Sequence, residues 1–427
     1  MKLKNIYGGI IIVLAVLAPS TAIACTTAVV SGRVTNDGRP LLWKNRDFSQ
    51  QHNEVIRLTG GTYKAIGVAN AGSRTSVWMG VNEAGFCIEN SLSLDLNSKT
   101  TTKGPGNGAL IRRALETCAT LNDFSELLQA TELTGRVTCG NFGVIDAHGG
   151  AAMFEVGRTS HRMFDANDPQ VAPNGYIVRS NFSITGQELP TLPGNTELAT
   201  VSSGGRYLRA YSLLESQGVG NISAEFLIRN CARDMADSNG VCISGSVNSD
   251  RPVLPRQIST AETISRATTV SATVFHCVRA DEDPNLTTML TILGDPKFSI
   301  AVPCWANTPV IPEDLEGKHG GEIGEIALTL REWGISDSKH KTINGTYLSE
   351  IWQNLWRIED EILSDARLLK NASSKTSTMA EFSHASARKA MAAMKNELLH
   401  TKTHALSIDT PKAPTFAETA TERWTRW

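Results

Sequence analysis

Cys25 directly follows a stretch that has the features of a cleavable export signal. Two lysines precede an apolar run over residues 10–18, and the small residues Ala22 and Ala24 come just before the cysteine. An initial charge, an apolar run and an A-x-A ending are typical of signal peptides. We therefore expect residues 1–24 to be removed and Cys25 to become the first residue of an exported protein.

A cysteine in first position carries a thiol and a free α-amine on one residue. The amine titrates near pH ~8 and an ordinary thiol near ~8.5, so the amine can take the thiol proton and later return it to a leaving group. Cys25 is thus the candidate nucleophile, with its own amine as the base. The alternative is a lipoprotein in which Cys25 only carries an anchor, although the usual leucine three residues earlier is here Ala22.

The chain after the cysteine alternates in hydropathy around the turn sequence NDG at 36–38, which predicts a β-hairpin. Such a hairpin brings Lys44, Arg46 and Asp47 back toward Cys25. A carboxylate at this place can orient the α-ammonium, and a cation can lower the pKa of the thiol. The alternative for the same run is a charged strand end that faces solvent.

These features resemble the linear-amide hydrolases of the N-terminal-nucleophile superfamily. A cysteine that opens C-T-T, followed after a hairpin by a motif like R-N-x-D and an aromatic residue, is similar to the choloylglycine hydrolase and penicillin V acylase family, the acid ceramidases and the isopenicillin N acyltransferase relatives. The family motif is usually G-R-N-x-D, and here it stands as W-K-N-R-D at residues 43–47. Asp47 matches the family aspartate. Lys44 stands at the arginine position and Arg46 at the variable one, so the cationic role is open between them; lysine lacks the bidentate fork of arginine.

Three further stretches are similar to family segments that contribute to the active site. GVNEAGFCIEN resembles the G-x-N-E-x-G-L stretch and makes Asn90 the nearest candidate for an active-site asparagine, with an ordinary strand-end asparagine as the alternative. GYIVRSNF resembles a T-N-x-F segment and implies Asn181. SSGGRYLRAYSLLE resembles an S-R-F-x-R stretch whose first arginine is Arg206 and whose second is Arg209.

Composition excludes several classes of protein. The 427 residues, 41% hydrophobic and with a net charge of -2, indicate a globular chain without a nucleic-acid footprint. Beyond the signal no apolar run approaches the roughly 18 residues that a membrane helix needs, so we expect a periplasmic or secreted product without a transmembrane segment. The eight cysteines include no C-x-x-C pair, and we expect neither a metal nor a cofactor. Export permits disulfides, and Cys231 with Cys242 is a candidate pair.

Antiparallel hairpins dominate the predicted secondary structure up to residue 312, and composition by itself indicates an α+β fold. The resemblance implies the four-layer αββα sandwich of N-terminal-nucleophile hydrolases over residues 25–312. Residues 313–427 are rich in Glu, Lys, Ala and Leu and predict a helical C-terminal extension with a flexible tail. The most regular predicted elements are hairpins at 77–90 and 141–157, a helical run at 109–133 that breaks near Asn122 and Asp123, and helices at 347–369 and 385–399.

The predicted function is that of an exported N-terminal-cysteine amidohydrolase acting on linear carbon–nitrogen bonds of small N-acyl compounds. Cys25 attacks the amide carbonyl and forms a thioester, which water hydrolyses. Asp47 orients the α-amine, and either Lys44 or Arg46 favours the thiolate.

The resemblance gives the remaining candidates their roles. Asn181, with Asn90 as a second donor, is expected to hold the oxyanion, and Arg206 to hold a carboxylate or steady the network. An acyltransferase, in which an amine intercepts the thioester, is an alternative, and so is a lipid-anchored or exported binding protein that has lost activity. The expected partner is a small-molecule amide and not nucleic acid, and a homo-oligomer is left open.

Overall fold

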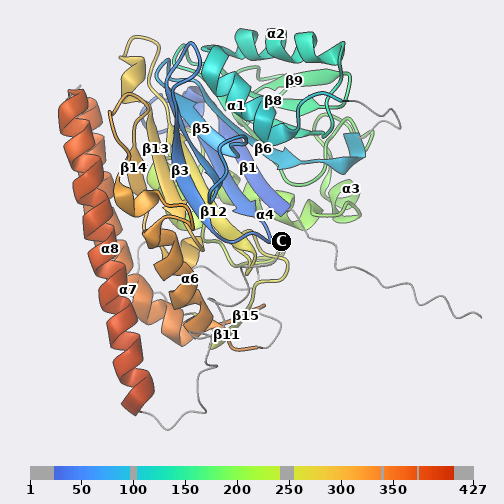
Figure 1. The fold of residues 1–427 in the computed structure, drawn as a ribbon. Helices are drawn as coiled ribbons and strands as arrows, with labels where there is room; N and C mark the ends of the chain where they lie inside the picture. The colour runs from blue at the N-terminus through green and yellow to red at the C-terminus, as the bar shows by residue number, and fades with distance from the viewer. Residues whose placement is uncertain (1–23, 97–102, 241–253, 338–340, 373–374, 408–427) are drawn as a thin grey trace, which may run out of the picture.

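The computed structural model describes residues 24–96, 103–240, 254–337, 341–372 and 375–407. Two β-sheets face each other, and helices cover both outer faces (Figure 1). The predicted α+β sandwich is therefore confirmed. The predicted signal, residue Cys242 and the predicted flexible tail from residue 408 lie outside the described residues.

The six-stranded sheet contains the predicted hairpin at its centre. Its strand order is β10-β1-β2-β12-β13-β14, with every neighbouring pair antiparallel. The hairpin strands β1 and β2 are joined through a short 3-10 turn, Gly32–Val34, and the turn sequence at 36–38. The strand bounds are β1 Ala24–Val30, β2 Leu41–Asp47, β10 Tyr176–Arg179, β12 Thr269–His276, β13 Thr288–Leu293 and β14 Val302–Cys304.

The seven-stranded sheet is an antiparallel meander in sequence order, from β3 to β9. Both predicted hairpins of this region are present, as β5 with β6 and β7 with β8. The bounds are β3 Asn53–Leu58, β4 Ala65–Asn70, β5 Met79–Asn82, β6 Cys87–Leu92, β7 Gly140–Ile145, β8 Ala151–Val156 and β9 His161–Asp165.

Two helices, α1 (Asn107–Thr117) and α2 (Leu121–Glu132), cover the outer face of the seven-stranded sheet (Figure 1). The predicted break near Asn122 and Asp123 was misplaced by a few residues. Thr120 is the N-cap of α2 and forms a reciprocal capping box with Asp123. Asp123 thus begins the second helix instead of interrupting the run.

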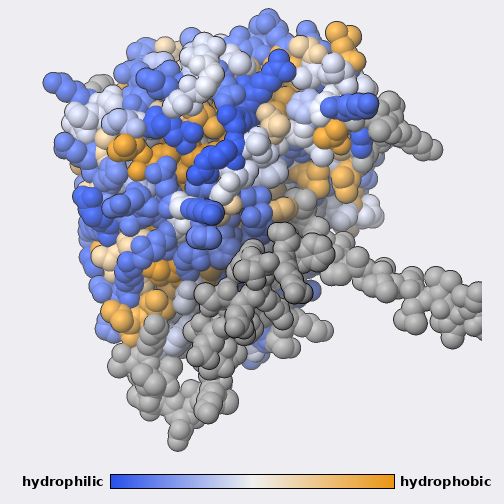
Figure 2. Space-filling view, in the orientation of Figure 1, coloured by the Kyte–Doolittle hydropathy of each residue, from blue (hydrophilic) through white to orange (hydrophobic). Residues whose placement is uncertain are grey.

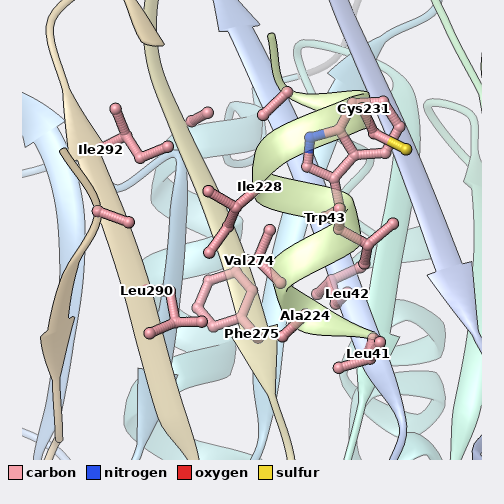
Figure 3. Packing of buried hydrophobic residues seen from close by; sticks show 14 of the residues in the cluster. Leu41, Leu42, Trp43, Ala224, Ile228, Cys231, Val274, Phe275, Leu290 and Ile292 are labelled. Carbon is pink, nitrogen blue, oxygen red and sulfur yellow. The ribbon is translucent and has the colours of Figure 1, made fainter. Parts of the chain in front are cut away.

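The outer face of the six-stranded sheet is covered by α4 (Gly204–Gln217), which follows the short α3 (Asn195–Ala199), and by α5 (Ala224–Phe226), which continues as a π-helical segment over Leu227–Cys231. Figure 3 shows this segment lying across the strands, with Ile228 and Cys231 beside Trp43, Val274 and Phe275. All five side chains are buried, so the segment closes the hydrophobic core behind the hairpin.

Three helices follow the sheets in the chain: α6 (Glu322–Gly334), α7 (Gly345–Asn371) and α8 (Thr376–Ser407). Sequence periodicity predicted α7 and part of α8 but not α6. These helices pack on the six-stranded sheet around β13 and β14, and α7 and α8 run along one side of the molecule (Figure 1). Two short strands, β11 (Gln257–Ser259) and β15 (Thr342–Asn344), pair beside them.

A buried ion pair fastens α7 to the sheet layer. Both carboxylate oxygens of Glu359 accept from the guanidinium of Arg233, at 2.7 and 2.8 Å, and one of them also accepts from the backbone N–H of Ala301. The indole of Trp352 donates to the backbone oxygen of Lys297 at 2.7 Å. The helices therefore share the core with the sheets.

The face of the molecule shown in Figure 2 is largely hydrophilic, with only small hydrophobic patches. Within the described ranges, no helix has the length and apolarity to cross a membrane. The same residues contain no group of three or more histidine, cysteine and acidic side chains arranged to hold a metal ion.

Candidate active site

The register of the hairpin decides which side chains surround the thiol. Cys25 lies opposite Arg46, and Thr27 lies opposite Lys44. Because side chains alternate along strands, Cys25, Lys44 and Arg46 point to the same face of the sheet. That face meets the seven-stranded sheet, where Thr27 donates to Glu89.

A cavity of about 270 Å³ lies on this face. Cys25, Lys44, Arg46 and Asp47 contribute to its wall, and Asn90 approaches from β6. Its other lining residues are mostly apolar or small: Phe48, Ser76, Trp78, Leu92, Gly106, Asn107, Gly108, Ala109 and Thr138. The cavity thus joins the candidate thiol to space that suits a small, largely apolar molecule.

The nitrogen of Cys25 is held by a polar network of Asn181 and Arg206. Asn181 Oδ1 accepts from this nitrogen at 2.8 Å and from Arg206 Nη2 at 2.7 Å. Arg206 Nη1 donates to the backbone oxygen of Cys25 and, at 2.8 Å, to Thr26 Oγ1. In the described chain this nitrogen belongs to the peptide bond after Ala24, and it stands where the α-amine would lie after cleavage.

Asp47 has one oxygen engaged and one that accepts no hydrogen bond from the described residues. Thr269 Oγ1 donates to Oδ1 at 2.6 Å, whereas Oδ2 has only the guanidinium of Arg266 at 3.5 Å. Burial raises the pKa of Asp47, and the charges of Arg266 and Arg206 oppose this rise. The backbone of Asp47 favours the thiolate of Cys25 and so opposes the rise of its pKa on burial.

Lys44 is the stronger of the two neighbouring cations in its effect on the thiol. Burial raises the pKa of Cys25, and the charge of Lys44 opposes this more than that of Arg46. Lys44 Nζ donates to the backbone oxygen of Trp78 at 2.9 Å and to Asn90 Oδ1 at 3.1 Å. The lysine therefore lies between the thiol and the candidate asparagine.

Arg46 is fixed by neutral groups. Its Nη1 and Nη2 donate to the side-chain oxygens of Asn53 and Asn70, each at 2.7 Å. Its guanidinium carbon lies 4.6 Å from the ring centre of Phe48 and 5.1 Å from that of Trp78. Burial lowers the pKa of Arg46 to about 10, so the group keeps its positive charge at neutral pH.

The structure brings together all seven predicted site residues and adds some that the sequence did not single out. Glu89 is fully buried behind Lys44, and burial raises its pKa to about 7. The only feature of the sequence that could have indicated Glu89 is a charged residue in a predicted strand, next to Asn90. Thr269 and Arg266 reach Asp47 from a part of the chain with no recognisable motif. Arg209 instead pairs with Asp234, at 2.7 Å.

The fold is thus an α+β sandwich with a cysteine-centred polar network between its two sheets. The sequence profile of the acyl-coenzyme A:6-aminopenicillanic acid acyl-transferase family matches residues 34–237, a little under half of the chain. This segment is therefore similar to that family, and the predicted resemblance is confirmed. The match includes Lys44, Asp47, Asn181 and Arg206 and begins after Cys25.

Several solved structures are similar at low identity. A penicillin V acylase from Agrobacterium tumefaciens has 14% identity and a TM-score of 0.40, over 69% of this chain and 89% of that one. A mutant of the conjugated bile acid hydrolase from Clostridium perfringens has 15% identity and a TM-score of 0.32, over 58% and 89% of the two chains. A comparison with curated protein sequences gave no match.

Proposed function

We propose that the protein is an amide hydrolase whose nucleophile is Cys25, created as an N-terminal residue by cleavage after Ala24 during export. The observation that carries this proposal is the position of the Cys25 nitrogen. It is held by Asn181, and the thiol of the same residue lines the cavity with Lys44 and Asn90. A free amine at this place is a base within reach of the thiol.

The proposed reaction has two halves. The α-amine takes the thiol proton, the thiolate attacks the carbonyl carbon, and the resulting ammonium gives the proton to the leaving nitrogen as the C–N bond breaks. Water then attacks the thioester, the amine again serves as base, and the acid leaves with the thiol restored. Lys44 stabilises the thiolate before attack, and its charge faces the oxyanion afterwards.

The sequence indicated that both asparagines hold the oxyanion. The contacts instead support Asn181 as a partner of the Cys25 nitrogen and Asn90 as the oxyanion donor. Asn181 uses Oδ1 for the Cys25 nitrogen and Nδ2 for the backbone oxygen of Leu92, at 2.9 Å. Its Oδ1 therefore supports the amine, and one of its two Nδ2 hydrogens is already used by Leu92. Asn90 accepts from Lys44 through Oδ1, and its Nδ2 donates to none of the described residues. We assign the oxyanion to Asn90.

The oxygen Oδ2 of Asp47, which accepts no hydrogen bond from the described residues, supports the proposal that Cys25 carries a free amine. A buried carboxylate oxygen without a hydrogen bond costs free energy, on the order of 1–3 kcal/mol. Cleavage after Ala24 replaces the single amide N–H of Cys25 by two in the free amine and three in the ammonium, which supplies a donor that the uncut chain lacks. The Asp47 carboxylate then orients the ammonium that forms during the reaction.

An acyltransferase of the same family is the second candidate, because the matching family is described by that activity. The two differ only in whether water or an amine receives the acyl group. Adding a second amine to a hydrolysis assay distinguishes them: a hydrolase yields mainly free acid, and an acyltransferase yields mainly the new amide.

The decisive experiment starts from the mass of the mature N-terminus. Protein that begins at an unmodified Cys25 is assayed against a panel of N-acyl compounds, with release of the amine monitored: acyl amino acids, bile-acid conjugates, acyl lactones and phenoxyacetyl amides. We expect turnover of at least one class. A diacylglyceryl group on Cys25, or no turnover by correctly processed protein, supports the anchored or inactive binding protein instead.

A further inference from the structure

Most buried cations elsewhere in the described structure contact a carboxylate, although Lys370 and Arg206 donate to neutral oxygens instead. Arg179 pairs with Glu155 at 2.9 Å, and Lys297 with Asp295 at 2.8 Å. Glu359 holds Arg233 in the same way. This is the expected arrangement, since a buried charge without a counter-charge is strongly destabilising.

The two cations of the cavity depart from this pattern. Within the described ranges neither Lys44 nor Arg46 has a carboxylate oxygen within the 4.0 Å of an ion pair. Lys44 has the thiolate of Cys25 as its counter-charge during the reaction, with Glu89 farther away. Cys25 and Asp47 also act on Arg46, but Lys44 has the larger effect on the thiol, so the proposed reaction relies less on the charge of Arg46.

The guanidinium of Arg46 is also held in a fixed orientation. Two of its five N–H groups are used by Asn53 and Asn70, and its plane lies against Phe48 and Trp78. None of these neighbours carries a negative charge, yet together they hold the side chain at the cavity wall. A guanidinium kept rigid in this way loses little entropy when it binds a ligand carboxylate.

We propose that Arg46 binds a carboxylate of the substrate, so that the preferred substrates are amides that carry a carboxylate near the scissile bond. This inference rests on the proposed hydrolysis of N-acyl compounds and narrows it. It predicts that N-acyl amino acids are better substrates than neutral acyl lactones and simple amides. Arg46 occupies the variable position of the W-K-N-R-D motif, so the selectivity is a property of this chain.

The test uses two matched pairs of substrates that differ only in charge. The first is an N-acylglycine and its methyl ester, in which the carboxylate lies on the amine half. The second is a glutaryl anilide and its methyl ester, in which it lies on the acyl half. For the pair that matches the site we expect kcat/KM for the acid to exceed that for the ester by about tenfold or more, mainly through KM.

Two variants assign this preference to the arginine. Arg46→Met removes the charge and keeps an apolar stem against the two rings, and we expect the acid-to-ester ratio to fall to about one. Arg46→Lys restores the charge without the fork, and we expect part of the ratio to return. The exposed Arg357 provides the control, because Arg357→Met removes a charge far along α7 and should leave the ratio as in the parent.

The outcomes separate the inference from the proposed function. Equal turnover of acid and ester overturns the inference and leaves the hydrolase standing. A preference that survives in Arg46→Met overturns the role of Arg46. If neither pair is turned over, the test uses binding to the Cys25→Ser variant. Calorimetry then compares its affinity for N-acylglycine with its affinity for the methyl ester. Equal or absent binding of the two there overturns the inference, and tighter binding of the acid that Arg46→Met abolishes supports it.

Discussion

Strand β2 shows two different uses of buried polar side chains on its two faces. On the outer face, Trp43 donates to Asn45 at 3.0 Å, and Asn45 donates to the backbone oxygen of Ala232 at 2.9 Å. On the inner face, Lys44 and Arg46 are equally buried but border a cavity and have no carboxylate partner among the described residues. The outer face satisfies its polar groups within the protein. The inner face keeps charge and donors for a molecule that is not part of the chain.

The largest expected effect tests the chemistry of the inner face. Cys25→Ser should abolish turnover, because a hydroxyl has a pKa far above that of the amine and is not activated comparably. Its unfolding midpoint should stay close to that of the parent. Cys118→Ser is the matched control, since Cys118 is buried in the layer of α1 and α2, away from the cavity. Turnover by Cys25→Ser at more than about a hundredth of the parental rate would remove the nucleophile from the mechanism.

The next effect concerns the carboxylate at the end of β2. Asp47→Asn keeps the shape and the contact with Thr269 but removes the negative charge that orients the α-ammonium. We expect kcat to fall by about a thousandfold with little change in KM, measured on folded protein. A fall of less than tenfold means that Asn181 and Arg206 suffice to orient the amine.

A third substitution breaks the ion pair beneath the outer face. Glu359→Gln should lower the free energy of unfolding by about 3–5 kcal/mol, because it leaves Arg233 buried without its charge partner. Activity per folded molecule should be unchanged. Ion pairing lowers the pKa of Glu359, so its stabilisation is present above pH ~4.5 and is lost as pH falls through the lower folded-state pKa. Urea titrations at pH 7 and pH 3 should therefore differ less for the variant than for the parent.

The smallest effect separates the two cations of the inner face. Lys44→Met should raise the pKa of the Cys25 thiol by about one unit, since it removes the strongest favourable charge beside the thiolate. Arg46→Met should raise it less. The pH dependence of iodoacetamide alkylation measures both, on protein that carries Cys242→Ser; the other cysteines that the structure describes are buried. The opposite ranking would give the cationic role to Arg46.

Local sequence signals predicted much of the hairpin and its chemistry. The alternating pattern and the NDG turn were enough to place Lys44, Arg46 and Asp47 near Cys25. They could not tell which polar atom of Asn181 faces the nitrogen, because that depends on how β10 and α4 pack together. Glu89 was not predicted, because a single acidic residue in a strand gives no sign of burial in the sequence. Its burial depends on how the two sheets pack together. Helix α6 was missed although Ile323, Ile326, Ala327 and Leu330 recur at helical spacing, because this run is short and contains a glycine.

Local sequence signals also did not predict how the helical extension contacts the rest of the chain. Residues 313–427 looked separable in composition, and the boundary at residue 312 stays a prediction. The contact between Glu359 and Arg233 joins residues that are 126 positions apart in the chain. No motif in either segment indicated the other, so only the folded structure relates them.

The buried nitrogen of Cys25 has a practical consequence for anyone who prepares the protein. It is hydrogen-bonded to Asn181, and Ala24 before it is only 6% exposed. Under the proposed mechanism, a single residue left over from an affinity tag or an initiator methionine would keep this nitrogen an amide and deprive the thiol of its base. We expect such a sample to fold and bind ligand but to show no turnover. Tags therefore belong at the C-terminal end, and the first residue of a recombinant sample should be sequenced before inactivity is taken as a property of the protein.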